Sequence, residues 1–563
     1  MASHLDGATL IKSTETMLRR RAFDWPLLLF LLSAAWGVWI AYDRAAAGTK
    51  FWLILGGLTL YVVCVYAPNW IHVNGRDAVS PLRVALSVLP TVVAICFLLT
   101  SDWARWIGKL PWLDLSMRWF LSWQPKGGPT LNPNVAGGII AAFLPLQVTA
   151  LSKVGRGRVW IDVLLVGVSA VGLLMSATRG AWSSLAVVTG GWGLWKLSGW
   201  LAQRWSANRQ PWIQMIIWAA ALLMVALVCI LMLRLTLLGA RLLVWIEEDR
   251  LDIWRNSLAL ASDYPFTGLG LGSFEMAYAS YVLLTHVGYI FHAHNLFLDV
   301  WLEQGLLGLL AFGLLVGKAV RSNRSVSTWR PAALAALGVI LLHGLMDDAF
   351  YGYGGRGVLL LFVPLAILNR SAAGAITNSF PTLSVFRPMP VFLSTVAILA
   401  LAVVCVPNLR AVFRANLGTL IQTRAELAVY RWPDWPIQDA LRRSTEVELD
   451  SAIGHYRAAL ALDPANVIAN RRLGQIELSR GQYESARHHL EAAYAAAPGQ
   501  RATRQLLGEC YAIAGEVERA AALWRTVDVS QGQLMARQWW HEYLGGRQSV
   551  TWIQQATALC ANQ

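Results

Sequence analysis

The residues of this sequence that could do chemistry are charged or titratable side chains placed beside long apolar runs. They are Arg179, Arg250, Arg255, His292, His294, Asn295, His343, Asp347, Asp348 and Arg356. An arginine guanidinium donates paired hydrogen bonds to phosphate oxygens. A neutral imidazole can take the proton of a hydroxyl group as that group attacks an electrophile. Charge beside hydrocarbon is costly, so such residues usually face a cavity, pair with one another or serve function.

Simpler interpretations of the same residues stay open at this point. A single arginine such as Arg179 or Arg250 can extend to lipid phosphates, and Asn295 can cap a helix. His292 and His294 have a spacing that suits two metal ligands, although no carboxylate stands beside them in the sequence. Asp347 or Asp348 would have to supply the third ligand from a distant part of the chain. We expect no metal and no other cofactor.

The composition predicts a membrane protein. Of 563 residues, 56% are hydrophobic and 14% are charged, whereas ordinary soluble domains have about 25% charged residues. The surplus apolar surface must therefore face lipid. The formal net charge of +14 is spread over short clusters between apolar runs, which excludes a nucleic-acid partner and is typical of cytoplasmic loops. The six cysteines include no CxxC pair, so neither a zinc site nor a disulfide framework is indicated.

We predict an all-α fold, a polytopic transmembrane helix bundle with about eleven spans, followed by a soluble α-helical repeat domain. The apolar runs that are long enough to cross the bilayer are residues 25–41, 51–68, 82–100, 134–151, 158–176, 180–198, 212–233, 296–317, 331–347, 351–369 and 389–408. The tenth run is the weakest because its first residues are polar and rich in glycine. The transmembrane domain would comprise residues 1–416 and the repeat domain residues 417–563.

Positive charge in the short loops predicts the orientation. Arginines precede the first span, and every second loop after it is basic: Arg19, Arg20 and Arg21; Arg76 and Arg83; Lys153, Arg156 and Arg158; Lys196, Arg204 and Arg209; Lys318, Arg321, Arg324 and Arg330; Arg370 and Arg387. The N-terminus would then be cytoplasmic and the repeat domain would lie outside. The side chains that could do chemistry gather on the same outer side.

Two long outer connections are expected, at residues 101–133 and 234–295. The first contains Trp103, Trp106, Trp112, Trp119 and Trp123, which would either stack on sugars or anchor the chain at the membrane interface. In the second, Leu251, Trp254 and Leu258 share one helical face that could lie flat on the membrane. The glycine-rich residues 268–272 match no nucleotide-binding fingerprint, and we expect a flexible turn there.

The C-terminal part of the chain repeats itself with a period of 34 residues. The positions that keep this register are Ala452, Ala486 and Ala520; Pro464 and Pro498; Leu473-Gly474 and Leu507-Gly508; Gly481 and Gly515. Small residues at this spacing, where paired helices touch, resemble tetratricopeptide repeats. About two full repeats are visible, and the helices on either side would cap them. Such a domain suits a protein partner or the acceptor of a reaction.

An ordered set of motifs resembles the O-antigen ligase and polymerase superfamily over roughly residues 25–370. The motifs are Asn132-Pro133-Asn134-Val135-Ala136-Gly137, Ser176-Ala177-Thr178-Arg179-Gly180-Ala181-Trp182, Arg250-x-x-x-Trp254, residues 265–274 (Pro-Phe-Thr-Gly-Leu-Gly-Leu-Gly-Ser-Phe), His292-Ala293-His294-Asn295 and Glu303-x-Gly305-x-x-Gly308. Each motif alone is weak, and their shared order is specific. Many members of the superfamily lack a repeat domain like the one predicted here.

The resemblance implies a metal-independent glycosyltransferase in the inner membrane. It would use a polyprenyl-diphosphate-linked glycan as donor and a lipid or glycan as acceptor on the outer face. By matching motif, Arg179 and Arg250 would hold the diphosphate, and His294 would be the base that acts on the acceptor hydroxyl. Arg255, His292, Asp347 and Arg356 are further candidates for substrate binding. A ligase is favoured over a polymerase or a protein O-oligosaccharyltransferase.

A transporter of a small anion is the competing class, because the same arginines could line a pathway. A transporter of this kind should show symmetry between its halves and broken helices near the middle of the bilayer. Neither feature is visible, and the polar residues gather at one face. A protein that only provides a scaffold would leave Arg179 and His294 unexplained.

Overall fold

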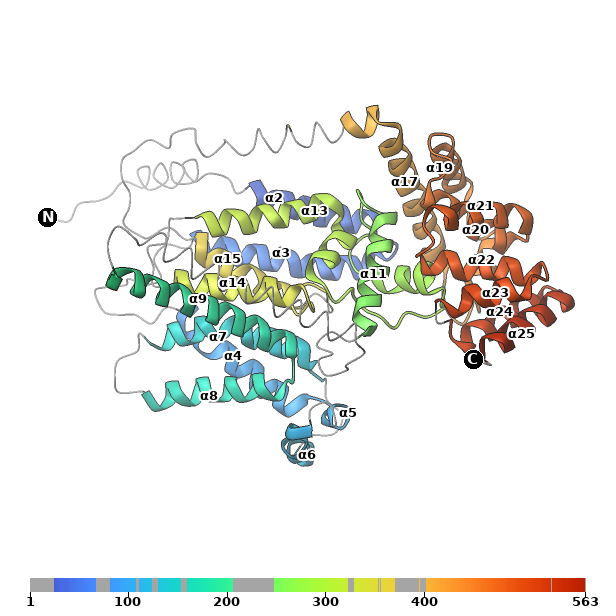
Figure 1. Cartoon of the computed structure of the whole chain (residues 1–563). Helices are drawn as coiled ribbons and strands as arrows, with labels where there is room; N and C mark the ends of the chain where they lie inside the picture. Colours follow the sequence, from blue (N-terminus) through green and yellow to red (C-terminus); the bar gives the residue numbers. More distant parts are fainter. Residues whose placement is uncertain are drawn as a thin grey trace.

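The computed structural model describes residues 25–66, 81–107, 111–123, 130–152, 159–205, 248–322, 329–352, 354, 356–369, 394, 401–527 and 529–561. Every regular element within these ranges is a helix, in agreement with the predicted all-α class. A bundle of helices carries the repeat domain beyond one of its ends (Figure 1). The predicted span 212–233 and most of the span 389–408 lie outside the described residues.

Nine helices of the described ranges form the bundle. They are α2 (Trp25–Ile40), α3 (Arg44–Tyr66), α4 (Pro81–Thr100), α7 (Pro133–Leu151), α8 (Val159–Met175), α9 (Arg179–Trp205), α13 (Leu296–Arg321), α14 (Arg330–Gly344) and α15 (Val358–Asn369). Four stretches are long and apolar enough to cross a membrane, namely Arg44–Val65, Leu82–Thr100, Pro133–Leu151 and Leu296–Arg321. This supports a helical membrane protein, while the total of about eleven spans stays a prediction.

Helix α7 lies at the centre of one half of the bundle, where it packs against α4, α8, α9 and α14. Its small residues allow this close packing. A Cβ at Gly138 would lie 2.6 Å from Cβ of Ala349 and 3.0 Å from Cε1 of His343. Small residues let neighbouring helices in membranes approach closely. In the other half, α3 packs on α15 and α2 packs on α13.

The tenth predicted span is shorter than its sequence suggested. Residues 345–352, 354, 356 and 357 form turns and irregular backbone, and helix α15 begins only at Val358. Its 12 residues rise roughly 18 Å at 1.5 Å per residue, which is less than the hydrocarbon thickness of about 30 Å. The connection before α15 instead places Asp347 and Asp348 among residues of other helices.

The two long connections contain short helices of their own. The first has α5 (Trp103–Trp106), a 3₁₀ turn at Pro111–Leu113 and α6 (Asp114–Trp123). Trp103 is completely buried and its Nε1 donates to the carbonyl of Leu98 at 3.1 Å, so this tryptophan belongs to the core. Trp112, Trp119 and Trp123 remain largely exposed. They keep both predicted roles, sugar stacking and anchoring at the membrane interface.

The second connection contains α11 (Glu248–Asp263), α12 (Phe274–Tyr278) and a π-helical turn at Ala279–Leu283. Leu251 and Leu258 are exposed on α11. Trp254 is half-buried, and its indole N–H donates a hydrogen bond to the backbone carbonyl of His294. Part of the predicted apolar face therefore points into the protein. The idea that α11 lies on a membrane surface stays a prediction.

The C-terminal helices stack in pairs, as the 34-residue register predicted. They are α17 (Pro407–Val429), α18 (Gln438–Arg443), α19 (Asp450–Leu460), α20 (Val467–Arg480), α21 (Tyr483–Ala496), α22 (Arg501–Ile513), α23 (Val517–Arg525), α24 (Gln531–Tyr543) and α25 (Arg547–Ala561). Figure 1 shows them as one curved stack in orange and red. The predicted domain boundary at residues 416–417 falls inside α17, so one continuous helix leads into the repeats.

Glycines at equivalent positions of the repeats have the same structural role. Gly474 and Gly508 each leave no room for a Cβ, because Leu490 and Trp524 of the partner helices press against them. Gly481 ends α20 with a φ of 81°, and Gly515 follows α22 with a φ of 84°. Positive φ favours glycine at both turns.

Candidate active site

Helix α11 attaches two distant connections of the chain to each other. Arg250 and Trp254 are one helical turn apart and therefore lie on the same face. Arg250 donates from Nη1 to the carbonyl of Met346 at 2.5 Å and from Nη2 to Oδ2 of Asp347 at 3.1 Å. The indole Nε1 of Trp254 donates to the carbonyl of His294 at 3.1 Å. The Arg-x-x-x-Trp motif thus holds the histidine turn and the Asp347 turn together.

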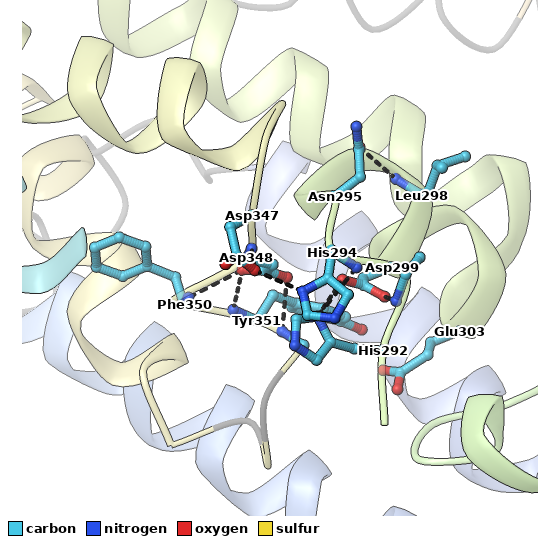
Figure 2. Close-up of polar contacts among 12 residues, drawn as sticks. His292, His294, Asn295, Leu298, Asp299, Glu303, Asp347, Asp348, Phe350 and Tyr351 are labelled. Atoms are coloured by element: carbon cyan, nitrogen blue, oxygen red, sulfur yellow. Dashed lines mark hydrogen bonds and ion pairs between the residues drawn. The ribbon is translucent and has the colours of Figure 1, made fainter. Parts of the chain in front are cut away.

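His294 has an uncommon backbone conformation that its neighbours fix from three sides. Its φ is 51°, and it is one of only three non-glycine residues with positive φ in the described ranges. Such a conformation costs about 1–2 kcal/mol. Its N–H donates to Nδ1 of His292 at 3.2 Å, its carbonyl accepts from Trp254, and its Nδ1 lies 2.9 Å from Oδ1 of Asp347 (Figure 2). Strain held in this way is common at functional sites.

The contact with Asp347 determines which nitrogen of His294 can act as a base. A carboxylate only accepts hydrogen bonds, so in the neutral imidazole Nδ1 carries the hydrogen and Nε2 carries the lone pair. The side chain of His294 is 27% exposed, whereas that of Asp347 is 6% exposed. The imidazole can therefore reach a substrate while the carboxylate stays behind it.

His292 stabilises the turn that contains His294. It is buried, and its Nδ1 accepts from the backbone of His294 and lies 3.5 Å from Oδ2 of Asp299. The other oxygen of Asp299 accepts from the N–H of Ala293 at 2.8 Å. Burial lowers the pKa of His292, which favours its neutral form. Asp299 was not among the predicted site residues, although it follows the histidine motif by only a few positions.

Asp348 organises the turn that contains Asp347. Its carboxylate accepts hydrogen bonds from the N–H groups of Phe350, Tyr351 and Gly352, at 2.9, 2.8 and 2.6 Å. A side chain at Gly352 would collide with this arrangement, because its Cβ would lie 2.7 Å from Oδ2 of Asp299. The carboxylate of Asp348 therefore binds successive backbone groups of this turn, and Figure 2 shows its contacts with Phe350 and Tyr351 beside the histidines.

Arg179 begins helix α9 and lies next to the same turn. It is half-buried, and a Cβ on the following residue, Gly180, would lie 3.6 Å from Cβ of Met346. The carbonyl of Met346 is the group that accepts from Arg250. Gly180 and the guanidinium of Arg250 therefore both lie at the Met346 turn, and the sharing of one ligand by Arg179 and Arg250 stays a prediction.

The first two sequence motifs pack on each other. Asn132 caps α7 by accepting from the N–H of Asn134 at 2.8 Å. Thr178 donates from Oγ1 to the carbonyl of Pro133 at 3.0 Å. At Gly137, a Cβ would lie only 2.6 Å from Oγ of Ser176. This close approach fixes the turn from which Arg179 extends, so these motif residues have a positioning role.

The glycine-rich residues 268–272 are not a freely flexible turn. They lie against helix α13, where Gly305 has φ 69° and ψ −172° and interrupts the helix. The freed carbonyl of Leu302 accepts from the N–H of Leu269 at 2.7 Å. Glu303 accepts from the N–H of Gly272 at 3.0 Å and pairs with Lys50 at 2.6 Å. The Glu-x-Gly motif therefore holds this loop in the folded core.

Two predicted residues do not join this assembly through any described contact. Arg255 is exposed on α11, and its closest ion pair is with Asp252 at 3.0 Å. Arg356 is also exposed, and within the described ranges no hydrogen bond connects it with His294, Arg250 or Asp347. Their roles in substrate binding stay predictions.

The geometry also brings together the three groups of the metal alternative. One ligand atom each of His292, His294 and Asp347 lies within 4.8 Å of the others. In that alternative, Asp347 would be the third ligand that the local sequence lacked. The Nδ1 atoms of both histidines already have partners, because Nδ1 of His292 accepts a backbone N–H and Nδ1 of His294 faces Asp347. A metal ion that used these Nδ1 atoms would have to compete with the hydrogen bonds.

Comparison with known protein families supports one of the classes considered from the sequence. Residues 164–313 match the O-antigen ligase family. Residues 477–533 match a tetratricopeptide repeat family. No curated protein and no solved structure matches the chain. The predicted resemblance to O-antigen ligases with C-terminal repeats is confirmed.

The O-antigen ligase match includes Arg179, Arg250, His292 and His294 and ends before Asp347. Together with the apolar helices, it supports a multi-pass membrane glycosyltransferase of the O-antigen ligase type. The position of Asp347 beside His294 comes from the folded chain alone.

Proposed function

We propose that this protein moves a saccharide from a polyprenyl diphosphate carrier onto an acceptor hydroxyl at the outer leaflet of the inner membrane. The observation that carries the proposal is the assembly of His294, Asp347 and Arg250, in which one carboxylate contacts both a potential base and a potential phosphate ligand. The O-antigen ligase match supports the reaction class. A polymerase or a protein O-oligosaccharyltransferase would use the same chemistry with a different acceptor.

The donor would be held by its diphosphate. Met346 and Asp347 fix the orientation of the Arg250 guanidinium, and Arg179 approaches the same turn from the start of α9. The N-terminus of a helix carries partial positive charge, which adds to the attraction for an anion. As the bond to the diphosphate breaks, negative charge grows on its oxygens, so arginines that hold it stabilise the transition state.

The reaction would be a single displacement. The acceptor oxygen attacks the anomeric carbon while Nε2 of His294 takes the acceptor's proton, and the electron pair of the old carbon–oxygen bond leaves with the polyprenyl diphosphate. The imidazolium formed at His294 would be stabilised by Asp347, 2.9 Å from Nδ1. One displacement inverts the configuration at the anomeric carbon. The proton on His294 then passes to solvent.

The site would face the outside of the cell. The starts of α7, α9 and α13 and the ends of α8 and α14 meet at one end of the bundle, the end at which α11 lies (Figure 1). The basic loops of the sequence belong to the other end, which supports an outer position for the site and the repeat domain. The acceptor would be a lipid A core, another lipid, a protein or a growing glycan.

The experiment is to replace Arg179 and Arg250 singly by lysine. Lysine keeps the charge but loses the planar fork, so each variant should express normally and lose most of its transfer activity. Because both residues would stabilise one developing charge, the double variant should lose less than the product of the single losses. The measurement is transfer from a purified polyprenyl-diphosphate glycan in detergent treated with a chelator.

Arg321 provides the matched control. It is an exposed arginine in the last turn of α13, at the opposite end of this helix from the histidine motif. Arg321→Lys should keep full activity because a lysine reaches lipid phosphates equally well. Full activity of Arg179→Lys and Arg250→Lys as well would exclude the diphosphate clamp and leave lipid anchoring as their role.

A further inference from the structure

The inner face of the repeat domain is occupied by the chain itself. Helices α20, α22 and α24 are the first helices of successive pairs, and their side chains line one side of the stack. Arg471 and Gln505 are 34 residues apart, as are Gln475 and Glu509, so the register that defines the repeats also places these groups side by side. Ser280, Leu284 and His286 of the second long connection line one small cavity together with Gln475, Gln505 and Glu509. We call residues 279–286 the docked segment.

The repeats bind the backbone of the docked segment. Arg501 donates from Nη1 to the carbonyls of Val282 and Leu283, at 3.2 and 3.0 Å. Gln533, from the next pair of helices, donates from Nε2 to the carbonyl of Leu283 at 2.6 Å. Leu284 then ends the helical turn with a φ of 55°, and its side chain still packs against the core of the repeats. These carbonyls belong to the last residues of the π-helical turn, where a helix leaves its carbonyls without partners of its own, so the repeats supply the missing donors.

A second attachment lies at the end of helix α11. Both Arg471 and Arg472 of α20 pair with Oδ2 of Asp263, the last residue of α11, and the Arg472 contact measures 2.9 Å. The Arg472 guanidinium also lies 3.7 Å from the ring centre of Tyr281 in the docked segment. All of these side chains are buried. Breaking a buried ion pair leaves an uncompensated charge, so this attachment is strongly held.

These contacts connect the repeat domain mechanically with the site. Helix α11 has 16 residues, which corresponds to about 24 Å at 1.5 Å per residue. Its last residue, Asp263, is bound by the repeats, and Arg250 and Trp254 near its start bind Met346, Asp347 and His294. A shift of the repeats would therefore be transmitted along one helix to the phosphate ligand and to the strained histidine.

We propose that the repeat domain is a positioning element of the transfer site, and that the docked segment is the internal peptide ligand that fills its inner face. The repeats would set the position of Arg250 and His294 in addition to any recruitment of an acceptor. A protein partner that used the inner face would have to displace the docked segment and would disturb the site. This inference rests on the proposed function for its effect on catalysis, but the attachment itself can be tested separately.

The first test is hydrogen exchange on the full-length protein in detergent. Arg501→Ala combined with Gln533→Ala removes the contacts with Val282 and Leu283. Because hydrogen bonds from a charged group are among the stronger ones, backbone exchange in the docked segment and in the last turns of α11 should become faster by on the order of tenfold or more. Exchange within α21 and α23 should stay unchanged, which shows that the repeats remain folded.

A variant on the outer surface of the repeats is the matched control. Arg519 is exposed and pairs with Glu516, and no described contact joins it to the docked segment. Arg519→Ala should leave exchange in α11 as in the wild type. Should the double variant fail to fold, Ser280→Ala removes the acceptor of the 2.6 Å hydrogen bond from Gln438 and leaves the repeats intact. Unchanged exchange in both the docked segment and α11 would overturn the proposal.

The second test separates positioning from recruitment. If the repeats position the site, Arg501→Ala with Gln533→Ala should lower kcat by tenfold or more and leave the KM for the acceptor nearly unchanged. A higher acceptor KM with normal kcat would overturn positioning and make the repeats a recruitment module. If the wild type transfers nothing from a polyprenyl-diphosphate glycan, the proposed function fails, while hydrogen exchange still decides the attachment.

Discussion

Asp347 offers the sharpest test of the site, because one carboxylate contacts two groups with different proposed roles. Its Oδ1 lies 2.9 Å from Nδ1 of His294, and its Oδ2 accepts from Arg250 at 3.1 Å. The variant Asp347→Asn keeps the shape of the side chain and removes the charge. The amide can also donate to Nδ1, which would favour the wrong tautomer and place the hydrogen of His294 on Nε2.

The expected magnitude follows from these two contacts. A hydrogen bond to a charged group contributes about 1.5–3 kcal/mol, and each 1.36 kcal/mol corresponds to roughly tenfold in rate. Loss of the His294 contact alone predicts about 10- to 150-fold. Loss of the Arg250 contact adds a factor of the same order, but the two effects overlap because the asparagine can still form weaker hydrogen bonds. We therefore expect kcat/KM to fall by about 10²–10³-fold.

The assay is steady-state transfer with donor and acceptor varied in turn, on wild-type, Asp347→Asn, His294→Ala and the double variant. If Asp347 acts through His294, the double variant should be little slower than His294→Ala alone. Any further loss in the double variant measures the contribution through Arg250. This additional loss should appear as weaker donor binding, because Arg250 is the proposed ligand of the diphosphate.

Asp252→Asn is the matched control for this test. Asp252 is an exposed carboxylate on α11 that pairs with Arg255, so its replacement should change the rate by less than twofold. The reasoning is refuted if Asp347→Asn keeps half or more of the wild-type kcat/KM. It is also refuted if the double variant loses the full product of the single losses, since independent residues behave in that way.

Two further predictions concern the histidines and the repeat domain. His294→Ala should slow transfer by about 10²–10⁴-fold with near-normal donor binding, and His292→Ala should do less harm; equal losses that added divalent metal restores would instead establish the metal site. In the repeats, burial opposes ionisation of Asp439 and Glu509, but Arg537, at 2.7 and 2.6 Å, lowers the pKa of both carboxyl groups. Because the folded pKa values lie below the unfolded ones, this stabilisation is complete above about pH 5 and is lost as the pH falls below about 4. Thermal unfolding in detergent at pH 7, 5 and 3.5 should show this loss in the wild type and much less of it in Arg537→Met.

The parts of the fold that the sequence predicted are those determined by local composition and spacing. Apolar length alone identifies a span such as Pro133–Leu151, because lipid requires the helix to satisfy its own backbone. The repeat register was equally readable, since Gly474 and Gly508 must both admit a large side chain from the partner helix. Neither inference needs information about distant contacts.

The features that sequence reasoning missed depend on distant contacts. The glycine-rich loop at residues 268–272 was predicted to be flexible, but it is buried. The interruption of α13 at Gly305 leaves the carbonyl of Leu302, more than 30 residues later in the chain, free to accept a hydrogen bond from Leu269. Trp103 looked like a surface residue but packs in the core. Asp347 was predicted as a substrate-binding residue or a third metal ligand and not as the hydrogen-bond partner of the base, because nothing in the sequence shows that the end of α14 returns to His294.

The motifs of the family divide into residues that would react and residues that hold the chain in place. In Arg250-x-x-x-Trp254, the tryptophan binds only a backbone carbonyl, yet that carbonyl belongs to His294. In the histidine motif, His292 accepts a backbone hydrogen and Asn295 caps α13, which leaves His294 as the member that faces outward. A motif match alone would treat these residues as equals. The hydrogen bonds distinguish them: Trp254 and His292 hold the strained backbone of His294, and Thr178 holds the turn before Arg179 to the start of α7.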